Sequence, residues 1–376
     1  MTYLNRVQFA RGAVACLAEE LALAGIARPL LVTDRGVIAA GLLDRLRAVL
    51  PDGMAVAVFD DVPPNPTEAA VLAAVKAYKD HRADGVIGLG GGSPLDLAKA
   101  VALLATHDGP LSQYAVIEGG LARITARAAP VVAVPTTSGT GSEVSRGALI
   151  VLGDGRKLSI GSPHLIPRAA ICDPEMTLGL PPMLTAGTGM DALAHCVETL
   201  CSPRMNPIAD AIARDGLARA WMALPRAVAD GSDVTAREAM MLASMQGALA
   251  FQKGLGAVHA LSHPLGGLSV PLHHGTLNAV LLPHVLRFNA SAIEGVLPLL
   301  AAAMDEPADA GLIADAIAEL SRAIGLPATL GEIGVPADIL PAIADAAMLD
   351  HHHLTNPRRA TRDEYLALLR AAHAGD

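Results

Sequence analysis

The first 180 residues alternate short apolar runs with segments in which apolar residues recur every three or four positions. The runs predict strands at 29–33, 54–59, 85–89 and 130–134, and the other segments predict helices at 35–50, 67–81 and 93–106. Such alternation is typical of a parallel sheet covered by helices on both faces. Two further short runs, 148–152 and 156–160, flank Gly153-Asp154-Gly155, which predicts a β-hairpin.

From about residue 184 onward the pattern shows only helical periodicity, with short breaks such as Pro203, Pro207 and Pro225. Residues 301–323 predict two helices that are broken at Glu306-Pro307. The proline-rich stretch 179–182 separates the two patterns. We therefore predict an α/β domain over residues 1–180 and an all-α domain over residues 181–376.

The composition argues against a nucleic-acid-binding, a disulfide-bonded and a membrane-spanning protein. The net charge of −9 argues against a nucleic-acid partner, because few basic groups are available to neutralise phosphates. The four cysteines form no CxxC pair, which favours reduced thiols in a cytoplasmic protein. No apolar stretch reaches the roughly 18 residues of a membrane span, and the N-terminus does not resemble a signal peptide.

Two polar loops are predicted to follow strands. Gly90-Gly91-Gly92-Ser93 ends one strand and opens a helix, where glycines and free backbone N–H groups suit a pyrophosphate. The spacing differs from GxGxxG, so a glycine-rich turn with Ser93 as N-cap is the alternative. The second loop, residues 135–143, carries Thr136, Thr137 and Thr140, and its alternative is a turn before a capped helix. Open α/β sheets bind ligands where such loops lie, so the pair predicts a dinucleotide.

Asp34 follows the strand predicted at residues 29–33. An acid at this place can accept hydrogen bonds from a ribose and repel a 2′-phosphate, which favours NAD over NADP. Arg35 could instead meet that phosphate, so NADP stays possible. Asp34 could also serve only as the N-cap of the next helix.

The helical half repeats a spacing of four residues between possible metal ligands. Asp191 and His195 form one such pair, His259 and His263 form another, and His273 and His274 follow shortly after. We predict that Asp191, His195, His259 and one of the paired histidines bind one divalent cation. One carboxylate and three imidazoles suit Fe²⁺ or Zn²⁺, although an isolated helical histidine is usually an ordinary residue.

Several motifs together resemble the iron-dependent (group III) alcohol dehydrogenase family, which is related to dehydroquinate synthase and glycerol dehydrogenase. The resemblance spans almost the whole chain and rests on Gly90-Gly91-Gly92-Ser93 with Asp96 and Lys99, on residues 135–140, on Gly189-Met190-Asp191-Ala192 with His195, on His259 with His263-Pro264-Leu265-Gly266, on His274-Gly275 with Asn278, and on Asn356-Pro357-Arg358.

This resemblance implies a Rossmann-like N-terminal domain followed by a helical domain. It implies NAD(P) binding by Gly91, Gly92 and Ser93, with Asp96 in the same motif and Thr136, Thr137 and Thr140 nearby. It also implies a metal held by Asp191, His195, His259 and His274. His263 matches the family histidine near the nicotinamide, so the resemblance implies that it relays protons.

Three places leave alternatives open. Counting forward from His263 favours His273 as the last metal ligand, whereas counting back from Gly275 favours His274; we choose His274, because a loop absorbs an extra residue more easily than a helix. Lys253 lies in a stretch that resembles 4-hydroxybutyrate dehydrogenases, so it could attract a substrate carboxylate or be a solvated lysine. Residues 351–353, three histidines, are interpreted as a solvated helix end.

The chain is therefore expected to be a metal-dependent, NAD(P)-linked alcohol dehydrogenase or aldehyde reductase acting on a small alcohol or hydroxy acid. The alternatives are a lyase of the dehydroquinate synthase type and a non-catalytic protein that binds nucleotide or metal. The resemblance also implies a homodimer or larger homo-oligomer.

Overall fold

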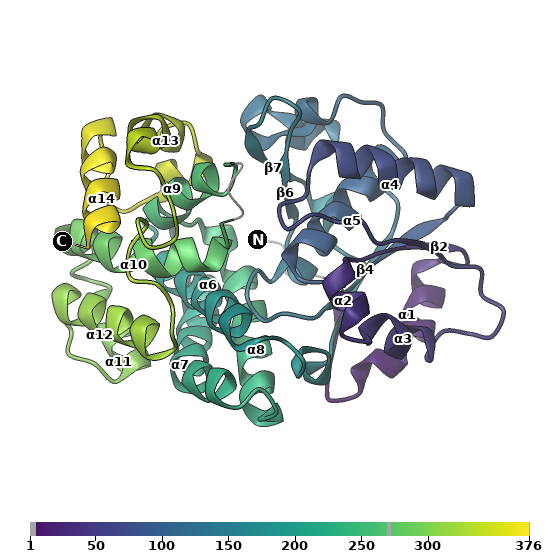
Figure 1. The fold of residues 1–376 in the computed structure, drawn as a ribbon, viewed down its shortest axis with the longest axis horizontal. Helices are drawn as coiled ribbons and strands as arrows, with labels where there is room; N and C mark the ends of the chain where they lie inside the picture. The colour runs from purple at the N-terminus through teal and green to yellow at the C-terminus, as the bar shows by residue number, and fades with distance from the viewer. Residues whose placement is uncertain (1–4, 269–271, 376) are drawn as a thin grey trace. The chain divides into compact units, whose positions relative to one another are not determined.

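The computed structural model describes residues 5–268 and 272–375. The chain divides into two compact units (Figure 1). One contains the chain up to Thr137 together with Gly141–Gly179, and the other contains Ser138–Thr140 together with the chain from Leu180 onward. The loop after the fifth strand therefore contributes residues to both units.

A six-stranded parallel sheet forms the centre of the first unit, with strand order β1-β8-β5-β4-β2-β3. Its strands are β1 (Arg6–Phe9), β2 (Pro29–Val32), β3 (Ala57–Phe59), β4 (Gly85–Gly90), β5 (Val131–Pro135) and β8 (Ala169–Cys172). The register pairs Leu30 with Val86 and Val86 with Val131. β6 (Gly147–Val151) and β7 (Lys157–Gly161) form a separate antiparallel pair, which confirms the predicted hairpin.

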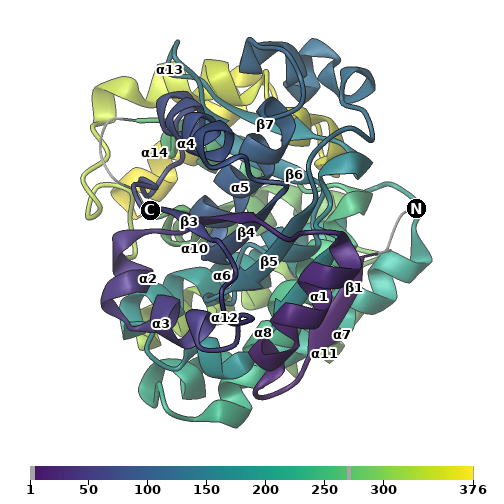
Figure 2. The ribbon, with the colours of Figure 1, turned by 90° about the vertical axis from the view of Figure 1, so that its right-hand side faces the viewer.

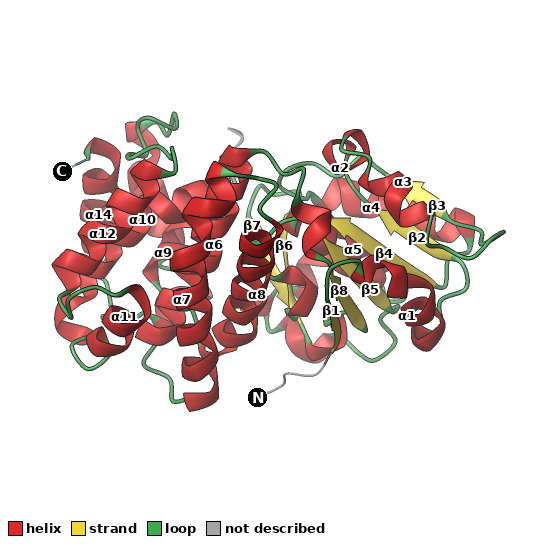
Figure 3. Cartoon of the chain, turned by 90° about the horizontal axis from the view of Figure 1, so that it is seen from below, coloured by secondary structure: helices red, strands yellow, loops and turns green. Residues whose placement is uncertain are grey.

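Helices cover both faces of the sheet, as Figures 2 and 3 show. The helices of this unit are α1 (Leu17–Ala24), α2 (Arg35–Ala39), α3 (Leu42–Arg47), α4 (Glu68–His81) and α5 (Gly92–Leu104). Alternate strand residues point to opposite faces: Leu30 packs in the core under α4 and α5, whereas Leu31 packs in the core under α1, α2 and α3. The predicted α/β architecture is confirmed.

Two sequence predictions in this unit differ from the structure. The single helix predicted at residues 35–50 is two helices, because Gly41 adopts a left-handed conformation with φ 75° between them. The strand predicted at residues 54–59 forms only at Ala57–Phe59.

The second unit consists of helices packed around one large hydrophobic core. They are α6 (Pro182–Cys201), α7 (Pro207–Ala229), α8 (Val234–Ala250), α9 (Ala257–Leu265), α10 (His274–Asn289), α11 (Leu297–Met304), α12 (Ala310–Ala323), α13 (Leu340–Ala347) and α14 (Arg362–Ala374), with a short 3₁₀ helix, η11 (His351–Thr355). The predicted break at Glu306-Pro307 lies between α11 and α12, as expected. Within the described residues, every helix is too short or too polar to cross a membrane.

Candidate metal centre and nucleotide site

Helix α6 presents a polar face within an otherwise apolar core. Asp191, His195 and Glu198 are spaced by four and three residues, so they lie on the same face of the helix. All three residues are at most 5% exposed. Because burying charged groups is costly unless they are paired, this face requires partners from neighbouring helices.

Close packing between α6 and α10 brings the second set of ligands to this face. A Cβ atom at Gly275 would lie only 1.9 Å from the carbonyl oxygen of Gly187, so the backbones can meet this closely only with glycine at position 275. The contact places His274, the first residue of α10, beside Asp191.

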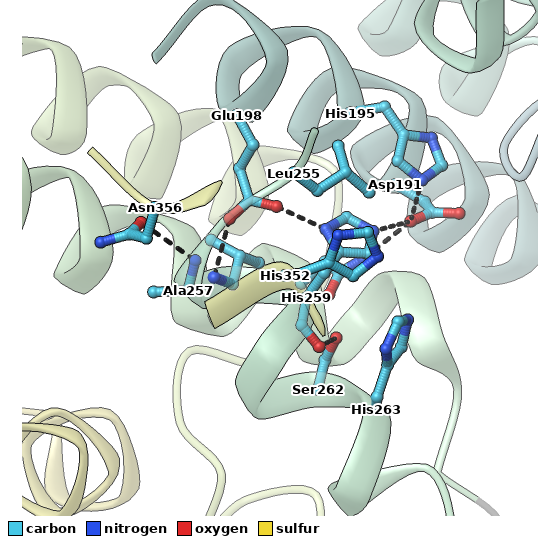
Figure 4. A network of polar contacts seen from close by, with 12 residues as sticks. Asp191, His195, Glu198, Leu255, Ala257, His259, Ser262, His263, His352 and Asn356 are labelled. Carbon is cyan, nitrogen blue, oxygen red and sulfur yellow. Dashed lines mark hydrogen bonds and ion pairs between the residues drawn. The ribbon is translucent and has the colours of Figure 1, made fainter. Parts of the chain in front are cut away.

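The start of α9 is fixed by side chains that bind its first N–H groups. Ala257 donates to Asn356 Oδ1 at 3.0 Å, and Val258 donates to Glu198 Oε1 at 2.8 Å. These bonds satisfy groups that a helix end leaves without partners. As a result, His259 projects toward Asp191 (Figure 4).

Three imidazole nitrogens surround one carboxylate oxygen. The Nε2 atoms of His195, His259 and His274 lie 3.6, 3.7 and 3.7 Å from Asp191 Oδ1. These distances are too long for hydrogen bonds. They are close to the separation of about 3.4 Å expected between ligands held at about 2.1 Å by one tetrahedral ion. Ligand atoms of Asp191, His195 and His259 all lie within 4.8 Å of one another, and His274 Nε2 lies beside the same carboxylate oxygen, so the cluster fits a metal ion.

Burial and charge act in opposite directions on these groups. Burial alone would raise the pKa of Asp191, but the neighbouring imidazoles outweigh it and hold that pKa well below its usual value. Burial lowers the pKa of His195 to about 4. Burial also opposes protonation of His259, but Glu198 and Asp191 outweigh it and raise that pKa to about 9. The buried acids thus attract positive charge to this point.

Glu198 determines which nitrogen of His259 faces Asp191. Its Oε2 lies 2.5 Å from His259 Nδ1, and because a carboxylate only accepts, Nδ1 must donate the hydrogen. Nε2 then offers a lone pair toward Asp191. An acid that orients a ligating histidine in this way is common around protein metal sites.

Asn278, one turn after His274, completes the cluster. Its Nδ2 donates to Asp191 Oδ1 at 2.7 Å and lies 3.3 and 3.2 Å from the Nε2 atoms of His259 and His274. Asn278 is fully buried. It therefore contacts three of the four possible ligands.

The structure separates the two adjacent histidines. His273 is the N-cap of α10, where its Nδ1 accepts a hydrogen bond from the Thr276 N–H at 3.3 Å. His274 instead faces Asp191. The chosen residue is the one that the structure places in the cluster.

The solvated helix end predicted at residues 351–353 is wrong for His353 but not for His351, whose side chain is 39% exposed. These histidines form η11, and His353 is buried with its Nδ1 3.0 Å from the hydroxyl of Tyr365. Asp350 Oδ2 lies 2.8 Å from His263 Nδ1, and ligand atoms of Asp350, His263 and His352 all lie within 4.8 Å of one another. η11 thus extends the histidine cluster, because chain folding brings it beside α9.

Lys253 is neither solvated nor free to bind a substrate carboxylate, the two alternatives considered from the sequence. The residue is 5% exposed, and its Nζ lies 2.5 Å from Asp210 Oδ1 and 3.4 Å from the carbonyl oxygen of Leu200. The solvated alternative is therefore wrong. The ion pair also neutralises the charge that a substrate carboxylate would require.

The first unit contains a topological switch point at the carboxyl ends of β2 and β4. These strands are neighbours, but the chain leaves β2 toward β3 and leaves β4 toward β5. Open α/β sheets bind ligands at such points. Asp34 follows β2 and Gly91 follows β4, so both predicted cofactor residues lie at this edge.

The glycine loop after β4 has the shape of a phosphate cradle. Gly90 has φ 146°, and a Cβ there would lie 2.6 Å from Pro94 Cγ, so a side chain is excluded. The next helix, α5, begins at Gly92 with no side-chain cap on its first N–H groups. Uncapped N–H groups at a helix start are suited to bind a pyrophosphate. Ser93 lies inside the helix and donates to the carbonyl of Pro64, so it is not the N-cap.

The other predicted cofactor residues differ in the contacts that they make and in the unit to which they belong. The Thr136 N–H donates to the Gly90 carbonyl at 2.9 Å, which joins the two loops. Thr137 packs against Gly91, whereas Thr140 belongs to the second unit. Asp34 caps α2 through the Val37 N–H at 2.9 Å, which confirms the N-cap alternative without excluding a ribose contact.

Asp96 positions the second loop. Its Oδ1 accepts from Ser142 Oγ at 2.5 Å, and its Oδ2 accepts from the Leu149 N–H at 2.8 Å. Lys99 donates to Ser142 Oγ at 2.8 Å and to the Gly147 carbonyl at 2.7 Å, and burial lowers its pKa to about 8. Both side chains thus hold the loop that carries the threonines.

Sequence reasoning overlooked Glu198 and Asp350 and misinterpreted His352. Glu198 could have been found, since it lies seven residues after Asp191 and three after His195 on one helical face. Asp350 carries no local signal, because it meets α9 through His263, which lies 87 positions earlier in the chain.

This arrangement, a carboxylate with three histidines in a helical unit and a glycine loop in an α/β unit, is that of a metal-dependent alcohol dehydrogenase. The chain belongs to the iron-containing alcohol dehydrogenase family. The family model described as iron-containing alcohol dehydrogenase matches residues 5–174, and the C-terminal model of the Fe-containing alcohol dehydrogenase family matches residues 185–373.

Individual relatives cover nearly all of the chain. A 4-hydroxybutyrate dehydrogenase from Cupriavidus necator is 54% identical over 375 residues, covering 98% of each chain. A 1,3-propanediol dehydrogenase from Klebsiella pneumoniae is 39% identical, covering 97% of this chain and 96% of the relative.

Solved structures agree with this. A 1,3-propanediol oxidoreductase is similar with a TM-score of 0.93 and 38% identity over 99% of both chains. A sulfoacetaldehyde reductase from Bifidobacterium kashiwanohense, solved in complex with NAD⁺, has a TM-score of 0.88 and 28% identity over 100% of both chains.

Proposed function

We propose that this alcohol dehydrogenase oxidises a short ω-hydroxy acid, 4-hydroxybutyrate, to the corresponding semialdehyde, with NAD⁺ as acceptor and Fe²⁺ as the resident metal. The cluster around Asp191 Oδ1 carries the proposal, because the Nε2 atoms of two buried histidines and of the half-buried His274 converge there without hydrogen-bonding to it. The substrate is supported by the relative named 4-hydroxybutyrate dehydrogenase, which is 54% identical.

The alcohol loses a hydride, which carries two electrons, and one proton, and the nicotinamide accepts the hydride. The carbinol carbon transfers a hydride to C4 of the nicotinamide, and the hydroxyl group loses its proton. One alcohol and one NAD⁺ thus give one aldehyde, one NADH and one proton. The metal, when bound, supplies Lewis acidity toward the substrate oxygen, which lowers the cost of losing that proton.

Four side chains would hold the metal, and a fifth orients one of them. Asp191, His195, His259 and His274 would hold the metal, and Glu198 keeps His259 Nε2 available to it. Among metals, the nitrogen and oxygen ligands suit Fe²⁺, and they would also accept Zn²⁺.

His263 is suited to carry the proton away. Its Nδ1 is bound to Asp350 Oδ2 at 2.8 Å, so Nδ1 donates and Nε2 remains the nitrogen that can accept. Because Asp350 fixes this tautomer and ring orientation, His263 needs no rearrangement before it accepts.

The cofactor would bind at the switch point of the sheet. The uncapped N–H groups at Gly92 and Ser93 would receive the pyrophosphate after Gly91, and the threonine loop that Asp96 positions would contact the nucleotide. NAD should be preferred over NADP, because Asp34 and Asp61 pair in a bridge after β2 and β3, where two acids would face the ribose and repel a 2′-phosphate. Arg35 is already paired with Asp61 at 3.0 Å, so it offers less to a 2′-phosphate.

The test is turnover after metal removal and replacement. Protein stripped by a chelator should produce no NADH from 4-hydroxybutyrate, and added Fe²⁺ should restore it, with NAD⁺ used better than NADP⁺. His195→Ala should lose metal and turnover together. Full activity in metal-stripped His195→Ala protein would contradict the proposal, as would metal binding without turnover of any alcohol.

A further inference from the structure

The histidine run of η11 lies against the metal cluster. The rings of His351 and His352 are 3.9 Å apart. The ring of His352 lies 5.9 Å from that of His259 and 5.3 Å from that of His263, and Figure 4 shows it beside His259. None of the roles above uses these two side chains.

Exposure increases from the metal cluster toward η11. The side chains of His259 and His263 are 2% and 5% exposed, whereas those of His274 and His351 are 20% and 39% exposed. The His263 ring stacks against His274 at 5.6 Å and against His351 at 6.5 Å. Of these four side chains, that of His351 is therefore the most open to solvent.

The acids near this row are already satisfied. Asp350 binds His263 with one oxygen and the His352 N–H, at 2.8 Å, with the other. Glu198 binds His259 and Val258. Both acids thus already have hydrogen-bond donors on their two carboxylate oxygens. Lys253, the cation considered from the sequence, is bound to Asp210 instead.

We propose that His351 and His352 bind the far carboxylate of the ω-hydroxy acid while its hydroxyl group faces the cluster of Asp191 and its three histidines. This inference rests on the proposed function and assigns its substrate recognition. An extended four-carbon ω-hydroxy acid spans about 6 Å from hydroxyl oxygen to carboxylate oxygen, given bonds of about 1.5 Å. The ring centres of His259 and His352 are 5.9 Å apart, so His352 lies within reach of a substrate of this length whose hydroxyl group faces the cluster.

Imidazole suits this task without a change in protonation. A neutral imidazole donates one N–H, and a hydrogen bond to a carboxylate is stronger than one between neutral groups. Losing such a bond to a charged partner reduces kcat/KM by about tenfold or more. Replacing His351 or His352 should therefore lower kcat/KM for substrates that carry the carboxylate and leave kcat/KM for simple alcohols unchanged.

The experiment compares 4-hydroxybutyrate with 1-butanol, which has the same carbon chain without the carboxylate. In His351→Leu and His352→Leu, which keep volume but remove the donor, the ratio of kcat/KM for 4-hydroxybutyrate to that for 1-butanol should fall about tenfold or more. His353→Gln is the matched control, because His353 lies in the same run but contacts Tyr365. Its ratio should equal that of the wild type.

A binding measurement separates this inference from the dehydrogenase proposal. Butyrate has the carboxylate but no hydroxyl, and calorimetry should show its dissociation constant rising about tenfold in both Leu variants of the Fe²⁺-loaded enzyme. Equal losses on both alcohols, or unchanged butyrate binding, would overturn the inference while leaving the dehydrogenase intact. Butyrate binding that depends on His351 and His352 in a protein that oxidises no alcohol would instead overturn the proposed function alone.

Discussion

Replacing Glu198 by glutamine tests how the metal cluster is built. In the native protein Glu198 Oε1 accepts from the Val258 N–H and Oε2 accepts from His259 Nδ1. Glutamine has the same shape but only one acceptor oxygen. The Val258 N–H requires that oxygen, so the amide NH₂ would face His259 Nδ1. Nδ1 would then have to accept, and the hydrogen would move to Nε2, the nitrogen that faces Asp191.

The expected cost follows from the loss of one well-oriented ligand. Substituting a residue that orients a metal ligand typically weakens metal binding 10- to 100-fold, which is about 1.4 to 2.7 kcal/mol. Glu198 is 5% exposed, so water cannot easily replace the lost acceptor. We therefore expect the upper part of this range for Glu198→Gln.

The assay is competition for Fe²⁺ with a chelator of known affinity, followed by metal analysis of the separated protein. Asp215→Asn is the control, because it also removes one carboxylate from the helical unit but from an exposed pair with Arg219 at 2.7 Å. The control should retain metal like the wild type. Metal affinity in Glu198→Gln within twofold of the wild type would refute the assigned orientation of His259.

Four further substitutions give three separate tests. His274→Ala should abolish metal retention, whereas His273→Ala should keep the metal and lose about 1 kcal/mol of stability with the N-cap of α10; mass spectrometry and thermal unfolding check this, and equal metal loss in both would contradict it. Burial raises the pKa of Glu143 from 4.5 to about 7. The folded state therefore binds more protons than the unfolded state between these values, and stability from this group falls as pH rises from 4.5 to 7, by up to about 1.4 kcal/mol per pH unit. Denaturation at several pH values should show a flatter profile in Glu143→Gln, and identical profiles would count against it. Gly90→Ala, at φ 146°, should lower the unfolding temperature and weaken NAD⁺ binding, and a variant as stable as the wild type would show that the loop tolerates a side chain.

The sequence predicted most of the architecture because its signals are local. The apolar runs and turn residues identified β2, β4 and β5, the hairpin of β6 and β7, and the helical second half. The sequence-based prediction was wrong between α2 and α3. Gly41, the N-cap of α3, separates the two helices through its left-handed backbone, although the apolar spacing continues through it.

The site was predictable to the extent that its residues share a helix. Asp191 with His195, and His259 with His263, were found by their spacing alone. The choice between His273 and His274 could not be made by counting, because it depends on which side chain caps α10. Asp350 was missed and His352 was misinterpreted, because their place beside α9 arises from tertiary packing of η11.

The most direct test of the central claim is a crystal of the Fe²⁺-loaded protein examined by anomalous diffraction at the iron edge. The account predicts one ion bound to Asp191, His195, His259 and His274, with Glu198 on the far nitrogen of His259. An ion bound by His273, or by Asp350 and His352 in place of Asp191, would contradict it.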